Sequence, residues 1–180
     1  TIRARRIIGA LFSAALLCGL AAPAAAKEIT VKHAQGELVL PDTPKRVLVQ
    51  DVAIIDILDA LGVEITGVTG DSHRYPDYLS KYTGKGYIKT GTLQEPNYEV
   101  IAGAKADLMI VASRSARKLD ELKRIVPTID LTPDNANFLA SVKRNITTLG
   151  KIFGKQQRAG ELVASIDAKF EQLRAATANN

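Results

Sequence analysis

The fold is decided by residues 46–68, which read RVLVQDVAIIDILDALGVEITGV. The apolar run at residues 46–50 predicts a buried strand. Apolar residues then recur at helical spacing from Ile54 onward, and Gly62 is suited to end the helix that they predict. Residues 65–68 predict the next strand. Strand, helix and strand in this order favour a parallel sheet covered by helices.

The same alternation continues along the chain. The next predicted elements are helices at residues 76–82, 97–105 and 119–126 and strands at residues 108–111 and 128–131. A hairpin of two short strands, residues 29–31 and 37–40, precedes them. The predicted fold class is therefore α/β, with a parallel-sheet lobe covered by helices.

After Asn135 the pattern becomes helical. One apolar stripe runs from Phe138 to Ile152, Gly154 interrupts it, and a second stripe occupies the helix that follows. The second helix needs a partner for its apolar stripe, so we expect its end to be poorly buried in this chain. We divide the chain into an α/β lobe, residues 27–135, and a helical segment, residues 136–180.

The beginning of the chain has the pattern of a targeting segment. A basic start with three arginines precedes an apolar run at residues 7–20, and small residues stand just before Lys27. This pattern predicts a cleaved signal peptide, residues 1–26, and a periplasmic protein. A membrane-anchored lipoprotein modified at Cys18 is the alternative, which the large side chain of Leu17 disfavours.

The composition is that of a folded protein, and it excludes several kinds of site. Of the 180 residues, 46% are hydrophobic and 24% are charged. Two histidines and one cysteine exclude a zinc finger, an iron–sulfur site and a disulfide scaffold. Without residues 1–26 the net charge falls from +5 to +2, and only 5% of residues are aromatic, so we expect no nucleic-acid partner.

Several segments in a fixed order carry a resemblance to a known family. They are residues 46–49 (RVLV), 55–62 (IDILDALG), 67–68 (GV), 95–101 (EPNYEVI), 106–110 (ADLMI), 120–128 (DELKRIVPT) and 134–138 (DNANF). In these segments the chain resembles the periplasmic binding proteins that supply iron–siderophores, haem or cobalamin to bacterial ABC importers. The catecholate-siderophore binders are the most similar members.

The resemblance implies two α/β lobes joined by a long helix, with the ligand between the lobes. This chain is similar to the first lobe and the connecting helix, so we expect a fragment or truncated product that lacks the second lobe. The implied function is capture of a ferric siderophore and its delivery to a membrane permease, by a monomer. We expect no enzymatic activity, no catalytic residue and no cofactor. We also expect no metal ligand from the protein, because the siderophore itself holds the iron.

The candidate ligand residues follow predicted strands, at the carboxyl ends where parallel sheets bind ligands. Arg114 follows the strand at residues 108–111, and its planar guanidinium is suited to the oxygens of an anionic iron chelate. By the resemblance, Arg114 also corresponds to the cleft arginine of the catecholate binders. The further candidates are His73, Arg74, Tyr75 and Gln50. The segment around His73 equally suits an ordinary polar loop.

Glu99 is a candidate of another kind. By the resemblance, it matches a surface glutamate that pairs with arginines of the permease. An acid in the first turn of a helix also stabilises the helix dipole, and both roles are compatible.

Three alternative functions remain open at this point. The ligand of a binding protein of this type is alternatively haem, cobalamin or another iron chelate. A nucleotide-binding enzyme domain is less favoured, because the chain has neither the spacing G-x-G-x-x-G nor a P-loop. A periplasmic sensor or adaptor that binds a partner protein is the third alternative.

Overall fold

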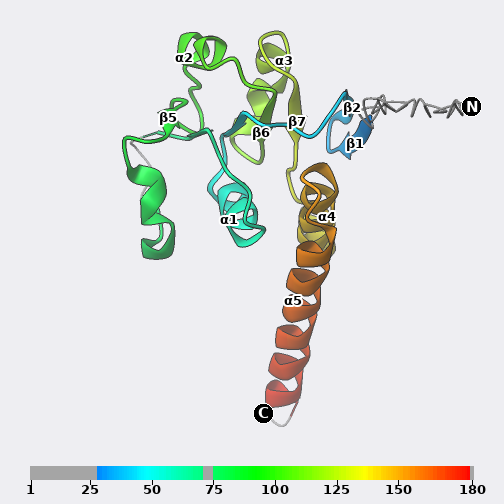
Figure 1. Cartoon of the computed structure of the whole chain (residues 1–180). Coiled ribbons are helices and arrows are strands. Elements are labelled where there is room, and N and C mark those ends of the chain that lie inside the picture. The colour runs from blue at the N-terminus through cyan, green and yellow to red at the C-terminus, as the bar shows by residue number, and fades with distance from the viewer. Residues whose placement is uncertain (1–27, 71–74, 179–180) are drawn as a thin grey trace, which may run out of the picture.

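The computed structural model describes residues 28–70 and 75–178. The predicted signal peptide and Cys18 lie outside the described residues, and so do His73 and Arg74. The described chain contains one five-stranded sheet, a separate hairpin and helices on both faces of the sheet (Figure 1).

Five short strands form the sheet in the order β5-β4-β3-β6-β7. They are β3 (Val47–Val49), β4 (Gly67–Val68), β5 (Ile88–Lys89), β6 (Leu108–Val111) and β7 (Thr128–Asp130). Every neighbouring pair is parallel. Because the strands run in the same direction, their carboxyl ends meet at one edge of the sheet. The predicted parallel-sheet lobe is confirmed.

Helices cover both faces of this sheet. The helices around it are α1 (Val52–Ala60), α2 (Tyr98–Gly103), α3 (Leu119–Leu122) and α4 (Phe138–Ile152). Val47 and Val49 share one apolar core with residues of α1 and α4, whereas Leu48 shares the other core with residues of α2 and α3. Successive strand residues point to opposite faces, which explains why a sheet covered on both sides needs continuous apolar strands.

The strand–helix–strand unit predicted from residues 46–68 is confirmed. The Asp51 carboxylate caps α1, since it accepts hydrogen bonds from the backbone N–H groups of Ala53 and Ile54 at 2.9 and 3.2 Å. Gly62 follows the helix with a φ of 69°, a left-handed conformation that glycine adopts without strain. The helix therefore ends just before Gly62, as the sequence predicted, and it begins two residues before the predicted apolar stripe at Ile54.

The predicted hairpin is also confirmed, and it lies against the edge of the sheet. β1 (Ile29–His33) and β2 (Gly36–Leu40) pair in antiparallel orientation as a two-stranded sheet. At the tip, the backbone N–H of Ala34 donates a hydrogen bond to the carbonyl of Asp130 at 2.9 Å. This contact places the hairpin tip beside the carboxyl end of β7.

Three elements differ from the prediction. β5 was not predicted, because two residues in a polar, glycine-rich stretch are too few to show a strand pattern. The predicted helix at residues 76–82 is a 3₁₀ segment, η1 (Asp77–Thr83). The predicted helix at residues 119–126 is shorter than expected, since α3 is a single turn that ends at Leu122, and a 3₁₀ turn, η2 (Ser115–Lys118), precedes it. A third 3₁₀ turn, η3 (Asn135–Asn137), precedes α4.

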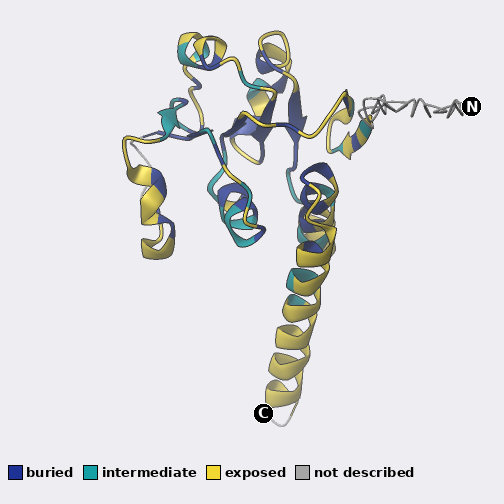
Figure 2. Cartoon of the chain, viewed as in Figure 1, coloured by how far each residue is buried: buried dark blue, intermediate teal, exposed yellow. Residues whose placement is uncertain are grey.

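The last helix, α5 (Gln156–Thr177), packs on α4 at its start and is exposed beyond that contact (Figure 2). At the contact, a Cβ added to Gly150 would lie 2.5 Å from the Cβ of Ala159, so this approach requires a glycine. Further along, Phe170 is 41% exposed and Leu173 is 61% exposed. The prediction that the end of this helix is poorly buried is confirmed.

Among the described residues, no helix is both long enough and apolar enough to cross a membrane.

We predict that truncating two leucines will have very different effects on stability. Leu58 of α1 is fully buried, so Leu58→Ala leaves a cavity and lowers the free energy of unfolding by about 2–5 kcal/mol. Leu173→Ala, the matched control on α5, changes it by about 0.5 kcal/mol or less. Urea unfolding followed by circular dichroism measures both. Similar losses in the two variants would contradict this account of the core.

Candidate functional site

Arg114 lies where the sequence predicted, just after the carboxyl end of β6. The side chain is exposed, and it lines a cavity of about 450 Å³ at that edge of the sheet. Ala112 and Ser113, which lead from the strand to Arg114, line the same cavity. Arg114 therefore supplies a cation at the place where a ligand of a parallel sheet binds.

The wall of this Arg114 cavity is largely apolar. It is formed by Val52, Ile54 and Ile57 of α1, by Leu93, and by Phe138 and Val142 of α4, among others. Phe138 stands at the start of α4 and is 58% exposed, although the sequence placed it in the buried stripe of that helix. An exposed aromatic ring and an arginine on one cavity suit a ligand that has both apolar and anionic parts.

Two carboxylates, those of Asp51 and Asp56, also line the Arg114 cavity. Asp51 accepts the hydrogen bonds that cap α1. Burial raises the pKa of Asp56 above its ordinary value, because a partly desolvated carboxylate disfavours its charged form. The Tyr78 hydroxyl donates a hydrogen bond to Asp56 at 3.5 Å. Both acids are thus engaged by neighbouring groups of the protein.

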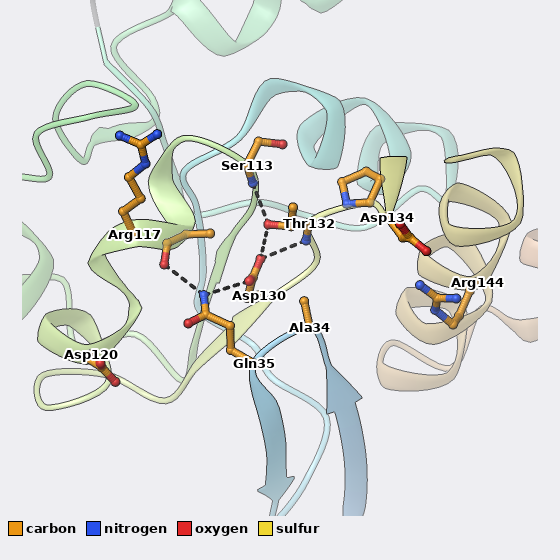
Figure 3. Close-up of a pocket in the computed structure, with 11 residues that line it drawn as sticks. Ala34, Gln35, Ser113, Arg117, Asp120, Asp130, Thr132, Asp134 and Arg144 are labelled. Carbon is orange, nitrogen blue, oxygen red and sulfur yellow. Dashed lines mark hydrogen bonds between the residues drawn. The ribbon is translucent and has the colours of Figure 1, made fainter. Parts of the chain in front are cut away.

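A second, more polar cavity of about 630 Å³ adjoins the first, and Ser113 and Pro133 line both (Figure 3). Its walls come from the hairpin tip, η2, the segment after β7, and α4. Arg117 and Arg144 reach it from opposite sides, and Asp130 lies at its base with hydrogen bonds to Gln35 and Thr132.

Gln50 lies at the carboxyl end of β3 but is completely buried. Its side-chain amide donates a hydrogen bond to the carbonyl of Thr92, and its side-chain oxygen accepts one from the Thr90 hydroxyl. Both ends of the Gln50 amide are therefore bonded to the segment that leads to Leu93, a residue of the cavity wall. The observed contacts make Gln50 a support for that wall.

Tyr75 is also buried at the carboxyl edge, beyond β4. Its hydroxyl donates a hydrogen bond to the carbonyl of Thr69 at 2.9 Å, and burial raises its pKa to about 12. Tyr75 is not among the residues that line the Arg114 cavity. The structure thus brings Arg114 to a cavity and buries Gln50 and Tyr75 in the supporting structure.

Glu99 is exposed in the first turn of α2. Asn97 caps this helix, since its side-chain oxygen accepts a hydrogen bond from the N–H of Val100 at 3.1 Å. The N–H of Asn97 in turn donates to the carbonyl of Thr90, just after β5, at 2.8 Å. This bond places the start of α2, and with it Glu99, near the carboxyl edge of the sheet.

Within residues 28–70 and 75–178, no three histidine, cysteine, aspartate or glutamate side chains gather in a group able to hold a metal ion. At the carboxyl edge of the parallel sheet, the cation of Arg114 lies beside the apolar wall of its cavity. The long, largely exposed helix α5 follows this lobe in the chain. That arrangement agrees with comparison to known proteins: the family model described as periplasmic binding protein matches residues 47–180.

The chain belongs to this periplasmic binding protein family. The petrobactin-binding protein YclQ of Bacillus subtilis is 35% identical over 150 residues, which are 82% of this chain and 47% of YclQ. The siderophore binding protein BauB, solved with ferric iron and two molecules of acinetobactin, is 36% identical, with a TM-score of 0.80 over 86% of this chain and 56% of BauB. The catecholate-siderophore binding protein VctP of Vibrio cholerae is 30% identical, with a TM-score of 0.79 over 85% of this chain and 55% of VctP.

These comparisons confirm the family that the sequence motifs indicated and the α/β fold. The chain spans about half the length of the relatives that it matches. Those relatives are siderophore-binding proteins by name, and others in the family are named as a periplasmic protein or as lipoproteins of ABC transporters. The family is thus one of extracytoplasmic binding proteins.

Several residues of the site were not predicted from the sequence. Leu93 follows a strand of only two residues, and Phe138 matches the apolar stripe of α4 too well to be recognised as exposed. Asp130 is the last residue of β7, and Thr132 follows it at the carboxyl edge, where the sequence predicted ligand loops. Their proximity to Ser113 depends on strand order, and no local pattern reveals it.

We predict that Gln50→Ala destabilises the protein in the absence of any ligand. The change leaves the Thr92 carbonyl without the donor that it has from Gln50, and the Thr90 hydroxyl keeps only its bond to the Val68 carbonyl. This loss costs about 1–3 kcal/mol. Gln94→Ala, at a nearby exposed position, is the control and leaves stability unchanged. Thermal unfolding of both variants measures the difference. A Gln50 side chain that served only as a ligand contact would show no loss.

Proposed function

We propose that this protein is the solute-binding component of an ABC importer, which captures a ferric siderophore in the periplasm and delivers it to a membrane permease. The observation that carries the proposal is Arg114, an exposed cation on a largely apolar cavity at the carboxyl edge of the sheet. The names of its relatives, which bind ferric siderophores, support the same substrate class.

We infer that the ligand is of the catecholate type. The guanidinium of Arg114 has a planar set of donors that matches neighbouring chelate oxygens, and the exposed ring of Phe138 offers a surface to an aromatic ring. The likeness to VctP supports this inference. The siderophore holds the iron, so the protein needs no metal ligands, cofactor or catalytic residue and has no enzymatic role.

The other predicted ligand residues have different roles in this proposal. His73 and Arg74 come after β4 in the sequence and lie outside the described residues, and we keep them as proposed polar contacts to the ligand. Tyr75 and Gln50 support the floor of the site, in keeping with their buried hydrogen bonds. Among the described residues, we assign the main charge contact to Arg114.

We propose the following organisation for the chain. Residues 1–26 are a cleaved signal peptide, residues 27–135 are the first lobe, and residues 136–180 are a helical segment that includes the helix connecting it to a second lobe. The ligand then binds between two lobes of a monomer. Two findings support a second lobe: the match covers about half of the relatives, and Phe170 and Leu173 lie exposed on α5.

We predict that Arg114→Ala weakens binding of a ferric catecholate by roughly one to two orders of magnitude. A charge-assisted hydrogen bond contributes about 1.5–3 kcal/mol, which corresponds to that loss of affinity. Arg114→Lys restores only part of it, because lysine lacks the planar fork. The measurement is a titration of the full-length protein with a ferric tris-catecholate, followed by fluorescence quenching.

The control for this titration is Arg117→Ala, which removes a neighbouring exposed arginine that lines the other cavity. We expect its affinity to stay near that of the wild type. Equal and negligible losses in the two alanine variants would remove Arg114 from the ligand site.

We predict that Glu99→Arg lowers iron uptake without changing affinity for the ferric siderophore. Glu99 is exposed outside the cavity, so its charge is available to arginines of the permease. An exposed ion pair contributes up to about 1 kcal/mol, so its loss lowers uptake by whole cells up to about fivefold. The arginine introduced by charge reversal also repels the arginines of the permease, which lowers uptake further. Glu37→Arg, on the exposed hairpin, is the control. Normal uptake by the Glu99 variant would exclude this docking role.

A further inference from the structure

A buried carboxylate stands at the base of the polar cavity in Figure 3. Asp130, the last residue of β7, is only 2% exposed. Its two carboxylate oxygens accept hydrogen bonds from the side-chain amide of Gln35 at 2.9 Å, from the N–H of Thr132 at 2.8 Å and from the Thr132 hydroxyl. Neutral donors thus hold this charge, and they fix its position between the hairpin tip and the segment after β7.

The Thr132 hydroxyl connects Asp130 to the loop that carries Arg114. Because this hydroxyl donates its hydrogen to Asp130, its oxygen is free to accept, and the N–H of Ser113 donates to it at 2.8 Å. The carboxylate therefore sets the direction of the hydroxyl. Figure 3 shows the chain of hydrogen bonds from Gln35 through Asp130 and Thr132 to Ser113.

Ser113 has an unusual backbone conformation that this bond stabilises. Its φ is +53°, in the left-handed region that residues with a side chain seldom adopt. On the other side of Arg114, the Ser115 hydroxyl accepts from the N–H of Ala112 at 3.1 Å and donates to its carbonyl at 2.9 Å. The two residues that flank Arg114 are therefore both fixed, and the conformation of Ser113 sets the direction in which the chain enters Arg114.

We propose that Thr132 is a positioning residue for Arg114, with Asp130 orienting its hydroxyl and Gln35 holding the carboxylate. The Thr132 hydroxyl keeps Ser113 left-handed, and this conformation keeps the guanidinium of Arg114 on the cavity. This inference rests on the proposed function, because the guanidinium is taken as the contact for the ferric chelate. Gln35 also donates to the carbonyl of Ala116 at 3.0 Å. The hairpin tip therefore contacts the segment after Arg114 directly and Ser113 through Asp130 and Thr132.

The first experiment measures the loop without any ligand. Thr132→Val keeps the shape of the side chain and removes the hydroxyl, whereas Thr132→Ser keeps the hydroxyl. Hydrogen exchange of the Ser113 amide should be slow in the wild type and the serine variant and at least about tenfold faster in the valine variant. Equal exchange in wild type and Thr132→Val would overturn the proposal.

The second experiment measures affinity for a ferric tris-catecholate in the full-length protein. Thr132→Val should weaken binding about fivefold to tenfold, and Thr132→Ser should bind as the wild type does. In the Arg114→Ala background, Thr132→Val should have no further effect, because its influence passes through Arg114. Ser113→Gly should restore part of the affinity to Thr132→Val, since glycine adopts a positive φ without the hydrogen bond.

The outcomes separate this inference from the proposed function. If Thr132→Val weakens binding equally with and without Arg114, the hydroxyl supports the fold in general and the positioning role is wrong. If the wild type binds chelates and Thr132→Val binds as tightly, the positioning role is also wrong while the proposed function stands. A wild type that binds no ferric chelate contradicts the proposed function itself.

Discussion

The structure depends on burying two central strands, β3 and β6, between helices on both faces of the sheet. Such strands need apolar side chains in both directions, and Val47, Leu48 and Val49 show this most clearly, since all three are buried. Because the strands are parallel, the chain must also cross back to the opposite edge of the sheet, usually through a helix, before each new strand begins. The polar groups of the connecting loops therefore collect at the carboxyl edge, and the Arg114 cavity is a consequence of this topology.

Buried polar side chains at that edge stabilise loops that have few apolar contacts. Gln50 holds the segment before Leu93, Tyr75 holds the end of β4, and Asp130 joins the hairpin tip to the segment after β7. Each of these side chains lies at or just beyond the end of a strand, and each has its hydrogen bonds satisfied within the protein. A cavity bordered by such bonds keeps its shape before a ligand arrives, which reduces the entropy lost on binding.

The sequence predicted the elements that have strong local patterns. The apolar runs at residues 47–49 and 108–111 are long enough to mark buried strands, and Asn97 and Gly62 stand where helices begin or end. β5 was missed because it is two residues long and gains its stability from pairing with β4. Local pattern alone does not distinguish a strand of this length from a loop.

The candidate site was predicted less completely than the fold. The position of Arg114 followed from its place just after a predicted strand and from family resemblance, and the structure brings it to a cavity. Gln50 and Tyr75 were correctly placed at the carboxyl edge, but which way a side chain points at a strand end depends on its neighbours in space. The bond between Ser113 and Thr132 joins residues 19 positions apart through the pairing of β6 with β7, so it required the structure.

A crystal structure of the full-length protein with a ferric catecholate siderophore would test the central claim most directly. We expect the chelate to occupy the Arg114 cavity, with the guanidinium within hydrogen-bond distance of a chelate oxygen and Ser113 still at positive φ. A chelate bound elsewhere on the protein, with Arg114 directed into solvent, would contradict this account of the site.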